Sequence, residues 1–310
     1  MVHGEVREGV RVGLDALAEI TALMQRIRDG HPTAGLFEAS DFQWWWAQRP
    51  RPTDAMPQLF WFDDRGLPVA AVIATTFGDG TQLDPVVLPD AAPEWVAHVM
   101  TRGLAHVSEH AITEVTLEVD RTDDVLAGVL AEHGLAATDD GYVEAWLATD
   151  CRPPVSPLAT GYRLTSRAEV LTTDAHRPHH LTHAGRNHDD VEPRLRQTSL
   201  YRPDLDLVVH APDGSVAGYG LFWYDPVTAT GLVEPMRTED AHQRRGIARH
   251  ILTAGVGRLA EAGALRIKIG YEPGNPGSGP LYRDVGFVPD RHTTVFAGPT
   301  TPATRGVRYP

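Results

Sequence analysis

The sequence predicts an α+β or α/β protein made of two similar domains, in which several β-strands precede a βαβ unit. Three observations lead to this fold class. The chain has 310 residues, more than one average domain holds. A proline-rich segment at 151–157 divides it nearly in half. Motifs of the first half also recur in the second, which indicates a duplication.

Composition and charge narrow the class of protein. Hydrophobic residues make up 42% and charged residues 22%, so the chain can bury cores. A net charge of −13 disfavours nucleic acid and anionic membranes as partners. No apolar run reaches the roughly 20 residues that span a bilayer, and the N-terminal segment lacks the apolar core of a signal peptide. With Cys151 as the single cysteine, we expect a cytoplasmic protein.

Repeated motifs set the expected domain boundaries. Asp84-Pro85 recurs as Glu234-Pro235, 150 residues later, and Gly134 recurs as Gly286, 152 residues later. Each half also has an aspartate–glycine hairpin turn, Asp63 to Gly66 and Pro212 to Gly214. We therefore expect domains at 1–150 and 158–310, joined by a linker at 151–157.

In the second half, periodicity places the elements in order. Apolar and β-branched residues predict strands at 205–210, 216–224 and 232–238. Apolar positions spaced three to five residues apart predict a helix over 245–262, which Gly263 ends. A strand at 265–271 follows, then a short helix at 281–285 and a hairpin around Pro289-Asp290.

The segment Gln243-Arg244-Arg245-Gly246-Ile247-Ala248 lies between the strand at 232–238 and the long helix. Glycine lets the backbone approach a ligand closely, and the first amides of a helix are unpaired donors at the positive end of its dipole. The segment therefore predicts a cradle for an anion such as a pyrophosphate.

These residues carry a family resemblance: the second half resembles the GNAT superfamily of acyl-CoA N-acyltransferases, and the duplication resembles its tandem members. The motifs that match are the strand end Met236-Arg237-Thr238, the loop Gln243 to Ala248, and Asn275 followed by Tyr282 and Gly286-Phe287. The resemblance implies two tandem GNAT-like domains, each a mixed, mostly antiparallel twisted sheet flanked by helices. It also implies acetyl-CoA or another acyl-CoA as donor, with no metal.

Within this resemblance, each motif has an expected role. Met236, Arg237 and Thr238 hold the acyl group and the pantetheine arm, with the backbone N–H of Met236 or of its neighbour polarising the carbonyl. The loop residues from Gln243 to Ala248, together with Asn275, bind the rest of the cofactor. Glu234, two residues before Met236, is the expected general base, and Tyr282 the expected acid for the departing thiolate.

Each of these roles has a simpler alternative. Glu234 also fits a strand-end residue or a salt-bridge partner, and Tyr282 fits a core aromatic. Arg244 and Arg245 also fit ordinary solvated charges. Asn275 also fits a turn residue, since Pro276, Gly277, Gly279 and Pro280 are poor helix formers where the family has a helical turn.

The first half serves as an internal comparison. Its counterpart of the loop, Ala92-Pro93-Glu94-Trp95-Val96, has no glycine and no arginine, and Ala131 stands in the position of Tyr282. We expect residues 1–150 to form a degenerate GNAT-like domain without an intact CoA loop, which shapes the substrate site or the domain interface.

Two further clusters of residues lie outside the motifs. His176, His179, His180, His183 and His188 lie within thirteen residues, but no cysteine or HExxH-type partner follows and Arg177-Pro178 interrupts a helix. We predict no metal site there. The run Trp44-Trp45-Trp46 fits packing, with at least one ring at an interdomain surface or the substrate site.

The expected function is acyl transfer from acyl-CoA to the amine of a small molecule. A non-catalytic acyl-CoA sensor and a protein lysine acetyltransferase remain as alternatives, because acceptor groups in this superfamily come from variable loops. The expected protein is a monomer or homodimer.

Overall fold

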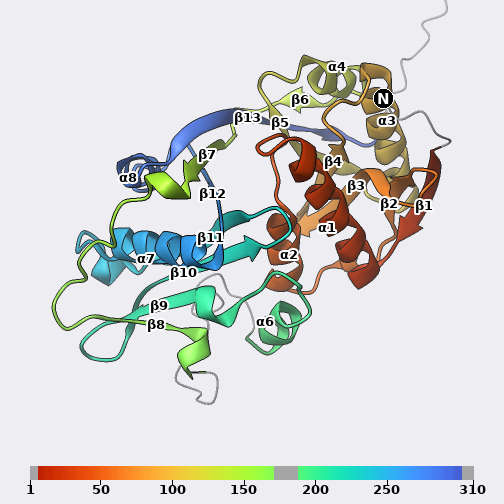
Figure 1. Cartoon of the computed structure of the whole chain (residues 1–310). Coiled ribbons are helices and arrows are strands. Elements are labelled where there is room, and N and C mark those ends of the chain that lie inside the picture. The colour runs from red at the N-terminus through yellow and green to blue at the C-terminus, as the bar shows by residue number, and fades with distance from the viewer. Residues whose placement is uncertain (1–5, 171–187, 302–310) are drawn as a thin grey trace, which may run out of the picture. The chain divides into compact units, whose positions relative to one another are not determined.

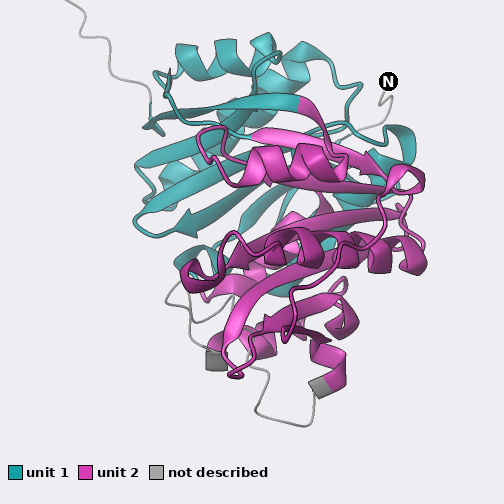
Figure 2. Cartoon of the chain, turned by 90° about the vertical axis from the view of Figure 1, so that its left-hand side faces the viewer, with its two compact units in different colours: residues 1–36, 51–142, 291–310 teal, residues 37–50, 143–290 magenta. Residues whose placement is uncertain are grey.

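The computed structural model describes residues 6–170 and 188–301, which form two compact units (Figures 1 and 2). Unit 1 comprises residues 1–36, 51–142 and 291–310, and unit 2 comprises residues 37–50 and 143–290. In each unit a mixed, mostly antiparallel sheet carries helices, as the sequence predicts. None of the helices in the described ranges has the length and apolar character needed to cross a bilayer.

The sheet of unit 1 runs in the order β1-β2-β3-β4-β5-β13, with β6 beside β13. Its one parallel pair is β4 and β5, which helix α3 connects, so this is a βαβ unit after a run of antiparallel strands. The elements are β1 (Arg7–Arg11), α1 (Gly13–Gly30), η1 (Pro52–Asp54), β2 (Gln58–Phe62), β3 (Pro68–Phe77), β4 (Gly80–Val87), α3 (Pro93–Glu109), β5 (Glu114–Asp120), α4 (Asp124–Glu132), β6 (Ala136–Ala137) and β13 (Val288–Pro299).

The sheet of unit 2 runs in the order β7-β12-β11-β10-β9-β8 and repeats this plan. Here α7 connects the parallel strands β11 and β12, and all the other pairs are antiparallel. The elements are α2 (Ala39–Gln48), β7 (Val143–Ala148), η2 (Thr149–Cys151), β8 (Arg163–Ser166), η3 (Arg167–Val170), α6 (His188–Leu195), η4 (Pro203–Leu205), β9 (Asp206–His210), β10 (Val216–Asp225), β11 (Thr230–Thr238), η5 (Asp240–His242), α7 (Ile247–Ala262), β12 (Arg266–Tyr271) and α8 (Ser278–Val285).

The two predicted hairpin turns are present, and aspartate side chains stabilise both. Asp63 Oδ1 accepts the amides of Arg65 and Leu67 between β2 and β3, and Gly66 takes φ +77°. Asp213 Oδ1 accepts the amide of Ser215 in the second turn. Short polar side chains that bind the backbone two residues ahead are the reason that such sequences turn.

Helix α7 begins and ends at glycines in the left-handed region, Gly246 with φ +78° and Gly263 with φ +106°. The helix packs closely on β10, and a Cβ at Gly255 would lie 2.0 Å from the Phe222 ring. Ile247 and the rest of its apolar face lie in the unit 2 core. Tight packing against the sheet therefore fixes where the helix starts.

Two predicted elements differ from the structure. The predicted hairpin around Pro289-Asp290 is wrong: both residues lie in the continuous strand β13, and neither has the positive φ of a tight hairpin turn. The short helix begins at Ser278 rather than 281, because Gly279 and Pro280 are tolerated in a first helical turn, where amides have no intrahelical partner.

Each unit takes its last strand from the other half of the sequence. β7 precedes the proline-rich segment but pairs with β12 of unit 2, and β13 follows α8 but pairs with β5 of unit 1. Helix α2 likewise belongs to unit 2. The units thus differ from the segments 1–150 and 158–310, and the boundary at 151–157 stays a prediction about the duplication.

Candidate acyl-transfer site

The central feature of unit 2 is the point where strands β11 and β12 separate. They pair in parallel from Thr230 to Leu232, and among the described residues of both strands no pairing follows Leu232. β11 continues along β10 on its other side, with Glu234 and Pro235 between the paired positions Val233 and Met236. The extra residue in β11 is a bulge, which bends the strand and frees backbone groups near Glu234.

The predicted loop follows β11 and leads into α7. Arg244 and Gly246 both take positive φ, 63° and 78°, and no side chain caps the helix start. A Cβ placed on Gly246 would meet nothing within 4 Å, so the space before the helix is open. Unpaired amides at the positive end of a 16-residue helix fit a phosphate, so these residues suit the pyrophosphate of an acyl-CoA.

The polar side chains around this loop differ in whether other described side chains already pair with them. Arg244 and Arg245 are exposed, and no described residue forms an ion pair with either. Arg237 instead pairs with Glu239 at 3.9 Å and Asp240 at 3.4 Å, while Gln243 Nε2 donates to Asp240 at 3.0 Å. The first two arginines are therefore available to phosphate, whereas Arg237 is already compensated.

Asn275 is an exposed turn residue. Its Oδ1 accepts the amide of Gly277 at 3.0 Å, and its own amide donates to the carbonyl of Glu272. This geometry is an Asx turn leading into α8, which the alternative interpretation of the sequence describes. Its predicted contact with the cofactor stays a prediction.

Tyr282 lies on α8 with its ring in the unit 2 core, at 5.6 Å from the Tyr271 ring and 6.2 Å from that of Phe287. Burial raises the pKa of its phenol to about 12. No described residue hydrogen-bonds to its hydroxyl, and none links Tyr282 to Glu234. The residue thus combines a packing role with a phenol that stays protonated throughout the neutral range.

Glu234 is partly buried at the bulge, and its backbone carbonyl accepts the indole N–H of Trp223 at 2.8 Å. Its carboxyl group is hydrogen-bonded to that of Asp41 on α2. Burial raises the pKa of Glu234 well above its ordinary value of 4.5, and the neighbouring Asp41 and Glu144 raise it further against the opposing effect of Lys268. A carboxylate with a raised pKa is a stronger base, which suits proton removal from an amine.

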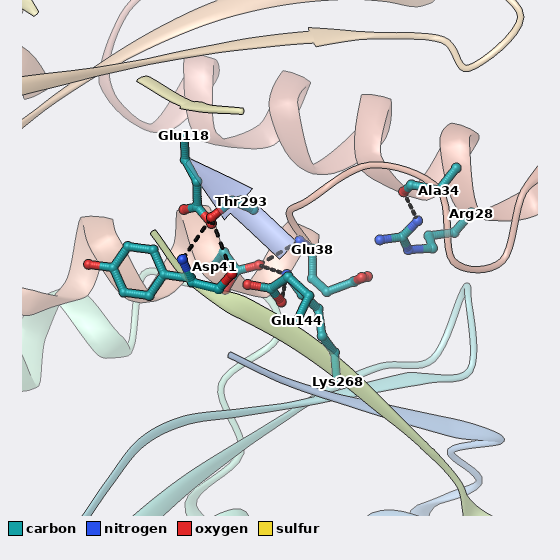
Figure 3. Close-up of polar contacts among 9 residues, drawn as sticks. Arg28, Ala34, Glu38, Asp41, Glu118, Glu144, Lys268 and Thr293 are labelled. Carbon is teal, nitrogen blue, oxygen red and sulfur yellow. Dashed lines mark hydrogen bonds and ion pairs between the residues drawn. The ribbon is translucent and has the colours of Figure 1, made fainter. Parts of the chain in front are cut away.

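Lys268 on β12 holds the acidic groups together (Figure 3). Its Nζ lies 3.4 Å from Asp41 Oδ2 and 3.0 Å from Glu144 Oε2, and these side chains are at most 9% exposed. Burial and the carboxyl groups of Asp41 and Glu38 raise the pKa of Glu144, although Lys268 lowers it. The pKa of Lys268 is raised by Asp41, Glu144 and Glu38, which outweigh its own desolvation.

Sequence reasoning singled out Glu234 but missed its four neighbours: Glu38, Asp41, Glu144 and Lys268. The one local signal was Lys268, a cation between Ile267 and Ile269 in an otherwise apolar strand. Lysine is almost never fully buried unless it is paired, so this pattern requires carboxyl partners, but it does not say where in the chain they are.

The remaining predicted clusters contribute less to the site. His176, His179, His180 and His183 lie outside the described residues, and the described ranges contain no group of three or more potential metal ligands. Trp44 and Trp45 are buried. Trp46 stacks on Arg194, whose guanidinium carbon lies 3.9 Å from the ring centre. These contacts within unit 2 agree with the predicted packing role of the three tryptophans.

The first-half counterpart of the loop has different chemistry. Helix α3 begins at Pro93, which has no amide hydrogen, and Glu94 follows it. Trp95 fills the first turn, with its ring 5.8 Å from that of Trp61. An acid and a missing donor at a helix start disfavour an anion there. That this half lacks an intact CoA loop stays a prediction.

Together, a parallel strand pair that separates, a glycine loop at a helix start and a buried carboxyl at the separation define the architecture of the acyltransferases that the sequence resembles. The acetyltransferase (GNAT) family matches residues 171–287, which include the loop, Glu234 and Tyr282. Residues 171–287 therefore contain a domain that matches this family, and the match supports acyl-CoA-dependent acyltransferase activity in general.

Solved structures share the fold of the whole chain. A tandem GNAT protein from the clavulanic acid biosynthesis pathway aligns with a TM-score of 0.68 and 14% identity, over 96% of this chain and all (100%) of that one. A GCN5-related N-acetyltransferase from Sphaerobacter thermophilus aligns with a TM-score of 0.63 and 16% identity, over 96% of both chains. A GNAT-family acetyltransferase from Colwellia psychrerythraea aligns at 0.57 and 12%, over 94% and 98%. No curated protein matches the sequence.

Proposed function

We propose that the protein transfers an acyl group, acetyl in the first instance, from acyl-CoA to the amine of a small molecule. The observation that carries this proposal is the position of Glu234, at the bulge of β11 where β12 separates and ten residues before the loop begins to present amides at Arg244. A base at the separation and an anion cradle beyond it are what direct attack on a thioester requires.

The acyl donor supplies an activated thioester carbonyl, and the chain's own residues bind the donor and transfer the protons. The amides from Arg244 to Ala248 and the guanidinium groups of Arg244 and Arg245 bind the phosphates. Glu234 takes a proton from the acceptor amine, whose nitrogen then forms the bond to the acyl carbon while the carbon–sulfur bond breaks. Tyr282 gives its proton to the departing sulfur, so that the products are an amide and CoA with a free thiol.

The experiment that tests this function is a panel of small amines incubated with acetyl-CoA, with free CoA and acylated amine both measured by chromatography. Chromatography is preferable to a thiol reagent because Cys151 is exposed and would react with the reagent. CoA release that depends on an amine and yields an equal amount of amide supports the transferase. Propionyl-CoA is included as a second donor. Tight acetyl-CoA binding without CoA release from either donor, in the presence of any amine, would instead favour the sensor.

A further inference from the structure

The buried contacts around Lys268 bring several carboxyl groups close together. Lys268 on β12 interacts electrostatically with Glu38 and Asp41 at the start of α2 and with Glu144 on β7. Glu234 on β11 interacts with Asp41, Glu144 and Lys268. Leaving several buried carboxylates ionised beside one another is costly, so part of the group must hold protons.

The contacts of Asp41 favour one of the two carboxyl groups as the holder of the proton in the pair of Asp41 and Glu234. Asp41 Oδ2 already accepts the amide of Glu38 at 2.6 Å and faces Lys268 Nζ at 3.4 Å. Both partners are donors, so Asp41 is held as an acceptor. A hydrogen bond between two carboxyl groups needs one proton, and because these donors stabilise negative charge on Asp41, the proton is favoured on Glu234.

We propose that Asp41, anchored by Lys268, is a positioning residue that holds the Glu234 side chain and sets the pH range in which Glu234 accepts a proton. This inference rests on the proposed function, in which Glu234 is the base. As pH rises, Glu234 loses its proton against the charges of Asp41 and Glu144, and Lys268 partly offsets them. The resulting carboxylate is a strong base, and taking a proton from the amine restores the hydrogen bond to Asp41.

A purely structural role for Asp41 makes a different prediction. Asp41 is the third residue of α2 and forms a capping box with Glu38, which by itself stabilises the helix start. Asp41→Asn keeps an oxygen for the Glu38 amide but removes the charge. Asp54→Asn is the matched control, because Asp54 accepts the Arg51 amide at 2.8 Å in the same kind of capping box in η1.

The test is the pH dependence of kcat/KM. In Asp41→Asn the acidic limb is expected to move to lower pH by about one unit, and in Lys268→Met to higher pH by a similar amount. Asp54→Asn should leave the limb in place. A uniform loss of kcat at every pH in Asp41→Asn, without a shift, would overturn the proposal and leave helix capping as the explanation.

A second measurement needs no substrate and no change at Asp41. Infrared difference spectra between the wild-type protein and Glu234→Gln are expected to show a protonated carboxyl band that persists above the pH at which an exposed glutamate ionises. If the band is present but no amine is acylated, the pairing stands and the proposed function fails. If acylation occurs and the band disappears at the pH where an exposed glutamate ionises, the function stands and the pairing is refuted.

Discussion

The buried aspartate at the start of β9 gives a quantitative prediction about stability. Asp206 has no exposed surface, and its Oδ2 accepts the Tyr201 hydroxyl at 3.0 Å. Burial raises the pKa of Asp206 from 3.8 to about 7, opposed by the Tyr201 hydrogen bond and by Arg167, while Glu192 adds to the rise. The folded protein thus holds a proton that the unfolded chain releases at much lower pH.

The sign follows from proton linkage. Because the folded pKa is higher, Asp206 contributes its full stability below pH 3.8, and that contribution is lost as pH rises to about 7. The shift is about 3 units at about 1.4 kcal/mol each, so the whole effect is about 4 kcal/mol. Between pH 5 and pH 8 the loss is about 3 kcal/mol, since the unfolded carboxyl is already ionised at pH 5.

Asp206→Asn removes this titration and keeps an acceptor for Tyr201. We expect the free energy of unfolding of the variant, relative to wild type, to increase by about 3 kcal/mol between pH 5 and pH 8. Urea unfolding at both pH values measures it, with Asp29→Asn on the exposed surface of α1 as control. A relative stability that is equal at the two pH values would show that Asp206 does not bind the proton.

Three further predictions concern the acyl-transfer site. Gly246→Glu should weaken acetyl-CoA binding at least tenfold, as measured by calorimetry. Gly66→Glu is the control, because Gly66 has a matching φ of +77° and equally open surroundings, and it should leave binding unchanged. Equal affinities of the two variants would refute the assignment of the loop as an anion-binding site. Glu234→Gln should lower kcat/KM on the order of 10²-fold or more with acetyl-CoA affinity preserved, and full activity would exclude a base role. Tyr282→Phe should lower kcat on the order of 10²-fold, and its phenol pKa of about 12 predicts no alkaline loss of activity from this residue below about pH 11; unchanged kcat would leave Tyr282 with packing alone.

Local patterns predicted most of unit 2. The strands on either side of α7, the helix itself and the turn at Pro212 to Gly214 agree with the structure within a few residues, because apolar periodicity and glycine conformations act over short stretches. The hairpin at Pro289-Asp290 failed for the opposite reason. Turn-forming residues do not report that a distant strand, β5, pairs with the chain beyond them.

The candidate site likewise contains residues that local sequence patterns identified and residues that they did not. Gly246 and Glu234 stand within one strand–loop–helix segment, so their spacing in the sequence was informative. Asp41 and Glu144 reach Lys268 from separations of 227 and 124 residues, and nothing in their own surroundings marks them as partners. Charge compensation inside a core depends on the tertiary fold, which no local pattern contains.

The exchange of β7 and β13 between the halves has a consequence for synthesis of the protein. A nascent chain that has reached the proline-rich segment has made β5 but not β13, so one edge of the unit 1 sheet stays unpaired until nearly the last described residue leaves the ribosome. The finished strand β7 likewise has no partner until β12 is made. A gene cut at the linker would therefore give two fragments that each carry an unpaired strand edge.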